Sequence, residues 1–257
     1  MSELLDHNAA PSCVHVEAGT YSIGNDSIPQ AGPRHQTCLK EFWIDASAVS
    51  LAHLEVFIAS GGYFESRWWS DSPQGGRAFL DSGSIDKRCI GIHMLSNEVT
   101  KRMNPRPRFS REVPAVGITW MEAAAVCRFF GARLPFESEW EVAMQTDEWN
   151  NSTGTAQAKK QMSRCGCELH LGLLEEWTAG AFTTRHWRGV DSFEFAAVDA
   201  PYGVCLRGST RESLFTDTAF RSSGDPRDPR EFRGFRRVWC EAPTYDQLSI
   251  DFRGGHQ

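Results

Sequence analysis

The sequence lacks the features that would mark a membrane protein or an exported one. No apolar run approaches the ~18 residues that indicate a membrane span. The N-terminal stretch MSELLDHNAAPSC has no basic region followed by an apolar one, which a signal peptide requires. Excess positive charge is also absent, because 27 Lys and Arg stand against 33 Asp and Glu, a net charge of −6. We therefore expect a cytoplasmic protein that binds neither nucleic acid nor a membrane.

The cysteines do not form the dense pattern of a disulfide scaffold. Eight of them are spread along 257 residues, and in a reducing compartment such residues are mostly buried thiols. The chain is long enough to bury a hydrophobic core that needs no disulfide bonds to stabilise it. No internal repeat and no shift in composition marks a boundary, so residues 1–257 are predicted to form a single domain.

Regular secondary structure is expected to be sparse, because 22 glycines and 12 prolines interrupt the chain while 9 tryptophans can pin long loops. Three helices are nevertheless predicted: 51–60 with Ser50 as N-cap, 119–131 with Thr119 as N-cap, and one that begins after Pro135. Thr119 and Glu122 have the spacing of a capping box. Short strands are predicted at Val14–Val16, Thr20–Ile23, Phe42–Asp45, Val204–Arg207 and Phe235–Trp239. The basic stretch 227–237 is expected to be a solvated or ion-paired face.

Six segments, in order along the chain, resemble one family. PAVGITWMEAAAVCRFFGARLPFESEWEVAM (114–144) resembles the signature of formylglycine-generating enzyme domains, also called sulfatase-modifying-factor domains. The other landmarks are AGTYSIGN (18–25), GPRHQTCLKEFWIDASAVS (32–50), GLLEEWTAGAF (172–182), CLRGSTRESLFTDTAFRSS (205–223) and GFRRV (234–238). The resemblance implies an α+β fold, the C-type-lectin-related formylglycine-generating-enzyme fold, with little regular secondary structure.

In this family the Arg-Leu-Pro turn and the acidic helix after it are scaffold. The resemblance therefore implies that Arg133 pairs with a helix carboxylate and that Trp140 packs inward. Phe136 stands where the family has Thr, so the usual N-cap hydroxyl is missing, a loss that typically costs ~1 kcal/mol.

One segment narrows the resemblance. FIASGGYFESRWWSDSP (57–73) is similar to the corresponding domain of ergothioneine-type sulfoxide synthases, whose non-haem iron is held by three histidines of a separate helical domain. This sequence has no H-x-x-x-H helix, so that site is not carried over. True formylglycine generators place two copper-binding cysteines in the interval that corresponds to 210–220, which contains none here. Formylglycine generation is therefore rejected as the activity.

The leading hypothesis is a stand-alone, metal-dependent oxidoreductase that tailors a small molecule or a peptide-bound residue in biosynthesis, as the family member of pyoverdine maturation does. The alternative is a non-catalytic, lectin-like module that binds a ligand or a partner. A protein partner that supplies the missing groups is compatible with either hypothesis.

Two strings supply the candidate metal ligands. The two thiolates and the imidazole of CGCELHLG (165–172) suit copper or zinc, and the histidine and carboxylate of HWRGVD (186–191) suit non-haem iron. Iron or copper is therefore the expected cofactor if a metal is bound. These candidate ligands are Cys165, Cys167, His170 and His186. The simpler interpretation is two buried thiols beside a structural histidine. The resembled families form a pocket where the tryptophan loop meets two later segments, and the substrate-binding candidates there are Trp68, Trp69, Trp177, Arg211, Glu212, Asp217 and Arg221. For each tryptophan alone a place in the core is favoured over a binding role, and Arg221 also matches a family landmark that braces strands.

Overall fold

The computed structural model describes residues 13–28, 30–69, 90–96, 98, 113–146, 161–171, 173–182, 203–208 and 217–248. None of the helices in these ranges has the length and apolar composition that crossing a membrane requires. The prediction of a single domain over 1–257 also concerns residues outside these ranges and stays a prediction.

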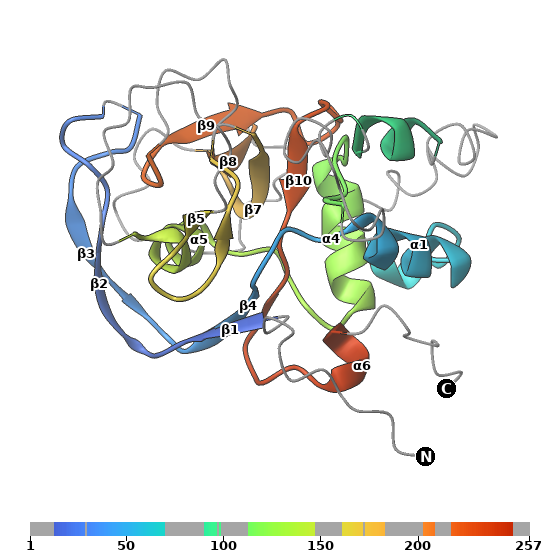
Figure 1. Cartoon of the computed structure of the whole chain (residues 1–257), viewed down its shortest axis with the longest axis horizontal. Helices are drawn as coiled ribbons and strands as arrows, with labels where there is room; N and C mark the ends of the chain where they lie inside the picture. Colours follow the sequence, from blue (N-terminus) through green and yellow to red (C-terminus); the bar gives the residue numbers. More distant parts are fainter. Residues whose placement is uncertain are drawn as a thin grey trace.

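Short strands and short helices alternate along the chain (Figure 1). The strands are β1 (Cys13–Val16), β2 (Gly19–Ile23), β3 (His35–Leu39), β4 (Phe42–Asp45), β5 (Gln161–Met162), β6 (Glu168–Leu169), β7 (Glu175–Ala181), β8 (Val204–Gly208), β9 (Arg221–Gly224), β10 (Arg233–Phe235) and β11 (Val238–Trp239). The helices are α1 (Leu51–Ala59), the 3₁₀ turn η1 (Ser66–Trp69), α4 (Trp120–Phe129), α5 (Glu137–Met144) and α6 (Tyr245–Leu248). Residues 90–96 are also helical. The content is α+β, as predicted.

The strands form two larger sheets and two separate hairpins. One sheet has the order β10-β7-β8-β9, in which β10 runs parallel to β7 and the other pairs are antiparallel. The other sheet places β4 between β1 and β11. The remaining pairs are the hairpins β2-β3 and β5-β6. Because β10 and β11 belong to different sheets, the predicted strand 235–239 is in fact two strands, separated by Arg236 and Arg237.

The helix α4 lies in the middle of the protein, and Figure 1 shows it between the strand β10 and the helix α1. Every residue of α4 except Arg128 is buried. A helix that is buried all round is not amphipathic, so the predicted single apolar face understates its burial. The predicted capping box is confirmed: the Thr119 hydroxyl accepts from the Glu122 amide at 3.2 Å, and the Glu122 carboxylate accepts from the Thr119 amide at 2.8 Å.

The other two helix starts differ in detail from the expected caps. Ser50 stands at the N-cap of α1, but its hydroxyl bonds the His53 imidazole at 2.8 Å instead of capping the helix. At α5 the N-cap Phe136 has no hydroxyl, and only the reciprocal bond is made, from the Phe136 amide to Glu139 at 2.8 Å. Glu139 also receives two hydrogen bonds from Arg133, at 2.7 and 2.6 Å, so the expected pairing of Arg133 is confirmed.

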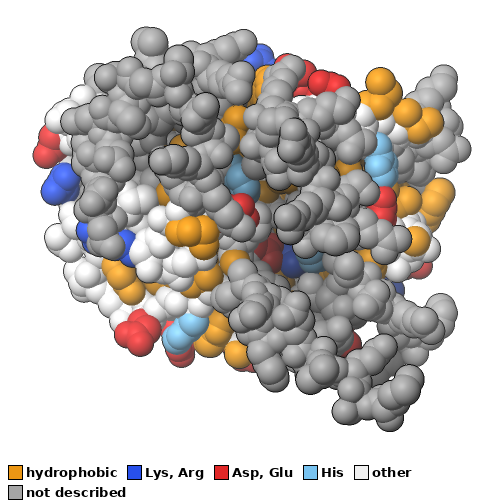
Figure 2. Space-filling view, viewed as in Figure 1, with side chains coloured by type: hydrophobic (Ala, Val, Ile, Leu, Met, Phe, Trp, Pro, Cys, Tyr) orange, Lys and Arg blue, Asp and Glu red, His pale blue; other side chains and the backbone are white. Residues whose placement is uncertain are grey.

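Two hydrophobic clusters make up most of the core. The larger gathers α1, η1, α4 and the central strands β7 and β8. The smaller lies between β1, β4, α5 and the hairpin β5-β6, and it includes Trp140, which packs inward as expected. Hydrophobic side chains on the surface gather at the right-hand edge of Figure 2, where Figure 1 places helix 90–96. Ile90 and Met94 of this helix are large exposed apolar residues, and so is Phe64, which follows α1 in the chain.

Candidate functional site

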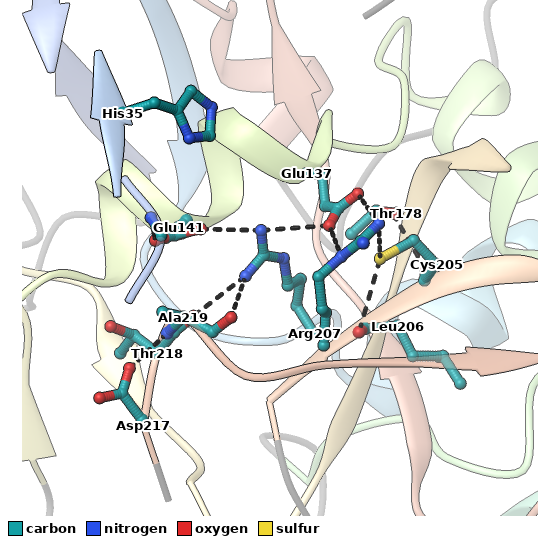
Figure 3. A network of polar contacts seen from close by, with 12 residues as sticks. His35, Glu137, Glu141, Thr178, Cys205, Leu206, Arg207, Asp217, Thr218 and Ala219 are labelled. Carbon is teal, nitrogen blue, oxygen red and sulfur yellow. Dashed lines mark hydrogen bonds and ion pairs between the residues drawn. The ribbon is translucent and has the colours of Figure 1, made fainter. Parts of the chain in front are cut away.

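Two carboxylates and two guanidinium groups meet between α5 and the sheet (Figure 3). Glu137 and Glu141 are one helical turn apart and therefore point to the same side of α5. Arg207 of β8 donates to Glu141 at 2.8 Å and lies 3.2 Å from Glu137. Arg221, the β9 residue paired with Arg207, donates to both oxygens of Glu137. The four charges cancel.

The groups of this buried network are poorly suited to proton transfer. Burial raises the pKa of Glu141, while Arg207 and a 2.6 Å hydrogen bond from the Gly24 amide oppose that rise. The Arg207 guanidinium also donates to the Ala219 carbonyl at 2.9 Å, and its Nε is buried without a partner among the described residues. Burial raises the pKa of the neighbouring Cys205 thiol to about 12. A neutralised network with a protonated thiol is suited to holding α5 on the sheet rather than to proton transfer.

A second ion network lies at the smaller core cluster. Arg236, which is fully buried, donates to the two carboxylate oxygens of Glu176 at 2.8 and 3.1 Å. Trp140 donates to the same carboxylate at 2.7 Å. Burial by itself raises the pKa of Glu176, but attraction to Arg236 outweighs it and lowers that pKa to about 2. Glu176 is therefore ionised over the whole physiological range.

The candidate metal ligands Cys165, Cys167 and His170 lie beside this network, where the fixed charge of Arg236 opposes a metal cation. The Arg236 guanidinium lies 3.4 Å from Nδ1 of His170, and the Glu176 carboxylate lies 3.8 Å from the same nitrogen. Burial raises the pKa of the Cys167 thiol to about 11. Within the described ranges no three His, Cys, Asp or Glu side chains are grouped to hold a metal ion. His186 lies outside those ranges, so the metal site stays a prediction.

Two of the tryptophans proposed for ligand binding belong to an aromatic cluster. Trp69 is 3% exposed and donates to the Gly62 carbonyl at 3.0 Å. Its ring lies 5.6 Å from that of Tyr63. Trp68 is partly exposed, and its ring meets Phe129 of α4 edge to face at 5.5 Å. The Arg67 guanidinium lies over the Trp68 ring, 4.5 Å from its centroid. The cluster therefore leaves Trp68 partly exposed and buries Trp69.

The remaining substrate-binding candidates are placed differently from one another. Trp177 is fully buried in β7 and donates to the Ile118 carbonyl at 2.7 Å, and Arg233 covers its ring at 4.9 Å. Asp217 is partly exposed and accepts from the Ala219 amide at 2.6 Å and from Asn25 at 3.1 Å. Arg211 and Glu212 lie outside the described residues. No ligand tests any of these seven residues, so their role in binding stays a prediction. Among the five that the structure describes, Trp68 and Asp217 are partly exposed, whereas Trp69, Trp177 and Arg221 are buried.

Sequence reasoning missed the carboxylates at the centre of both ion networks. The spacing of Glu137 and Glu141 was a readable signal, since residues four apart share a helix face. Glu176 had no such signal, because its partner Arg236 lies 60 residues further along the chain. The basic stretch is ion-paired, as one of the two interpretations held, but Arg233, Arg236 and Arg237 are buried rather than on a face.

Comparison with known proteins places this arrangement in a family. The sequence model of the sulfatase-modifying factor enzyme 1-like domain matches residues 2–151, more than half of the chain. The chain belongs to this family. The structure resembles that of PvdO from Pseudomonas aeruginosa with a TM-score of 0.52 and 16% sequence identity, over 88% of this chain and 93% of that one. This likeness confirms the predicted α+β formylglycine-generating-enzyme fold.

Among curated members and relatives of the sulfatase-modifying factor family, hercynine oxygenase of Mycolicibacterium thermoresistibile is 26% identical over 85% of this chain and 54% of its own length. The bovine formylglycine-generating enzyme is 27% identical over 50% of this chain and 38% of its own length. The chain thus spans about half the length of the hercynine oxygenase. The similarity to the oxygenase extends past the segment that the family model matches.

Proposed function

We propose that this chain is an oxidative tailoring enzyme of the sulfatase-modifying factor family, metal-dependent and acting on a small molecule or a peptide-bound residue. The observation that carries the proposal is the similarity to hercynine oxygenase over 85% of the chain. Formylglycine generation is not proposed, because the interval 210–220 has no cysteine.

The aromatic cluster supports a substrate role for the tryptophan loop. Tyr63, which is 1% exposed, donates to the buried Glu122 at 2.8 Å. The Trp69 ring packs on Tyr63, and Arg128 of α4 donates to the Trp68 carbonyl at 2.8 Å. The loop is thus held rigidly on α4 with the Trp68 ring at its accessible side. A rigid, partly exposed indole is a typical anchor for a ligand.

The metal of the proposed reaction needs ligands in addition to Cys165, Cys167 and His170, because the described residues contain no group of three possible ligands. We propose that residues outside the described ranges, His186 among them, or a protein partner supply those ligands. The relatives are consistent with further protein around the site, because the chain covers only 54% of the hercynine oxygenase.

Metal content and oxygen consumption test the proposal together. The protein is purified without chelator, reconstituted anaerobically with iron(II) or copper(I), and analysed for bound metal. Oxygen uptake is then followed with hercynine and, separately, with a cysteine-containing peptide. Stoichiometric metal together with substrate-dependent oxygen uptake is the expected result. No stoichiometric metal and no uptake with either substrate would contradict the proposal.

A matched pair of variants tests the tryptophan loop. Trp68→Ala should raise KM for the oxidised substrate at least several-fold, because a central aromatic contact contributes roughly 2 kcal/mol or more. Trp43→Ala is the control, since Trp43 is also partly exposed and its ring stacks on His15 at 4.4 Å in strand β4, away from the tryptophan loop. Equal effects of the two substitutions would mean that loss of stability, not loss of a substrate contact, is being measured.

The alternative is a binding module without catalysis, and the paired state of both ion networks favours it. The Glu137, Glu141 and Glu176 carboxylates all receive guanidinium hydrogen bonds or ion pairs, so none is an available base. This alternative predicts calorimetric binding of hercynine or a peptide that is unchanged by metal and by oxygen. Turnover of the bound ligand would rule it out.

A further inference from the structure

The hairpin β5-β6 carries two cysteines at its tip. Met162 pairs with Glu168, and the Ser163 amide donates to the Cys167 carbonyl at 2.8 Å. The Gly166 amide donates back to the Ser163 carbonyl at 3.0 Å, which closes a tight turn through Cys165. Gly166 has φ +93°, a left-handed conformation that glycine adopts without strain. The turn thus brings the chain around sharply between the two cysteines.

Both cysteine side chains lie at the same hydrophobic cluster. Cys167 is fully buried and belongs to that cluster, while Cys165 is partly buried and packs against it. Both side chains therefore contact this cluster, and a single residue separates them in the chain. They differ in access, because solvent reaches Cys165 and does not reach Cys167. This is the arrangement of an attacking thiol and a resolving thiol.

We propose that Cys165 and Cys167 form a thiol–disulfide exchange site for low-molecular-weight disulfides. The Cys165 thiolate attacks one sulfur of the disulfide, forms a mixed disulfide and releases one small thiolate. The Cys167 thiol then loses its proton and attacks the Cys165 sulfur, which releases the second small thiolate. The protein gives up two electrons and two protons, and the small disulfide is reduced to two thiols.

The surroundings of the two thiols set the order of these steps. Burial raises the pKa of Cys165, but the neighbouring Arg164 opposes this rise. Burial also sets the order, because a small disulfide reaches the partly buried Cys165 and does not reach the buried Cys167. A disulfide across one glycine is also strained, and strained disulfides are readily reduced.

Peptide mapping tests the proposal on the intact protein. Trypsin releases residues 165–185 as one peptide that contains these two cysteines and no other. The protein is treated with oxidised glutathione, alkylated under denaturing conditions and digested without reductant. The expected product is this peptide without alkylation and with two hydrogen atoms fewer.

Single variants separate the two roles. Cys167→Ser should trap the glutathione adduct on Cys165, whereas Cys165→Ser should leave Cys167 unmodified in the folded protein. The exposed Cys38 and Cys240 serve as internal controls that form mixed disulfides only. Circular dichroism confirms that each variant is folded. Full alkylation of both cysteines after treatment, equal modification of Cys167 when Cys165 is absent, or pairing of Cys165 with Cys13 would each overturn the proposal.

Discussion

Replacing Arg236 by Met should destabilise the protein far more than removing an ordinary salt bridge. The substitution keeps much of the apolar volume but leaves the Glu176 carboxylate, 2% exposed, without its cation. Breaking a fully buried pair by removing one partner typically costs about 3–5 kcal/mol. That is a large part of the roughly 5–15 kcal/mol that stabilises a domain.

The dependence on pH gives this prediction its sharpest test. In the native protein the pKa of Glu176 is lowered to about 2, so its stabilising contribution is complete above the ordinary value of 4.5 and is lost as the pH falls from 4.5 toward 2. In Arg236→Met the attraction is gone and burial raises the pKa of Glu176 instead. A raised carboxyl pKa stabilises the folded state at low pH. The variant should therefore regain stability, relative to the native protein, between pH 7 and pH 5.

Urea unfolding followed by tryptophan fluorescence at pH 7 and pH 5 measures both effects. Arg133→Met is the matched control, because the side chain of Arg133 is 22% exposed and its pairing with Glu139 is partly solvated. A second substitution, Glu176→Gln, should restore part of the stability that Arg236→Met removes. The reasoning is refuted if Arg236→Met costs no more than Arg133→Met at pH 7, or if its cost is the same at both pH values.

Three other perturbations have defined outcomes. Thr119→Ala removes the cap of α4 and should lower the free energy of unfolding by ~1 kcal/mol in urea titrations, and an unchanged midpoint would contradict the capping role. Gly208→Ala places a Cβ 2.6 Å from a backbone oxygen at φ +82° and should cost about 1–3 kcal/mol, whereas Gly180→Ala, with no atom within 4 Å, should differ little in thermal denaturation. The pKa of His53 is lowered by burial to about 4, so its contribution to stability is complete above 6.5 and is lost as the pH falls toward 4. Comparison with His53→Gln over this range should show the loss only in the native protein, and parallel pH profiles would exclude it.

The helices could be predicted because their signals are local. A capping residue, a periodic apolar run and a terminating glycine lie within a few residues of one another, as in 119–131. The strand β7 could not be predicted in this way. Its sequence EEWTAGA does not alternate, because Glu176 is buried against Arg236 while the adjacent Trp177 is buried in the larger core. Where both faces of a strand are buried, period-two patterning disappears.

The candidate site was harder to predict from the sequence than the fold, because it also depends on contacts between distant parts of the chain. A sequence does not show whether a tryptophan lies in a surface loop or in the core. Only the packing in the structure shows that Trp68 is partly exposed and that Trp69 is buried. The arginines of 227–237 also look like surface charge in isolation. Arg230 and Arg233 pair with the nearby Asp228, but the partners of the buried Arg236 and Arg237 are Glu176 and Asp45, 60 and 192 residues away, so no short window of sequence contains these two pairs.

The position of β4 between β1 and β11 has a consequence for how this chain is made. The Asp45 amide donates to the Arg237 carbonyl, and the Asp45 carboxylate accepts from the Arg237 amide and guanidinium. The early strand β4 thus pairs with residues that lie some 190 positions later in the chain and are synthesised after it. During translation one edge of β4 has no partner and the Asp45 charge has no counter-ion. Such non-local pairing slows folding and exposes a strand edge, so the nascent chain is a natural client for chaperones until residue 239 has emerged from the ribosome.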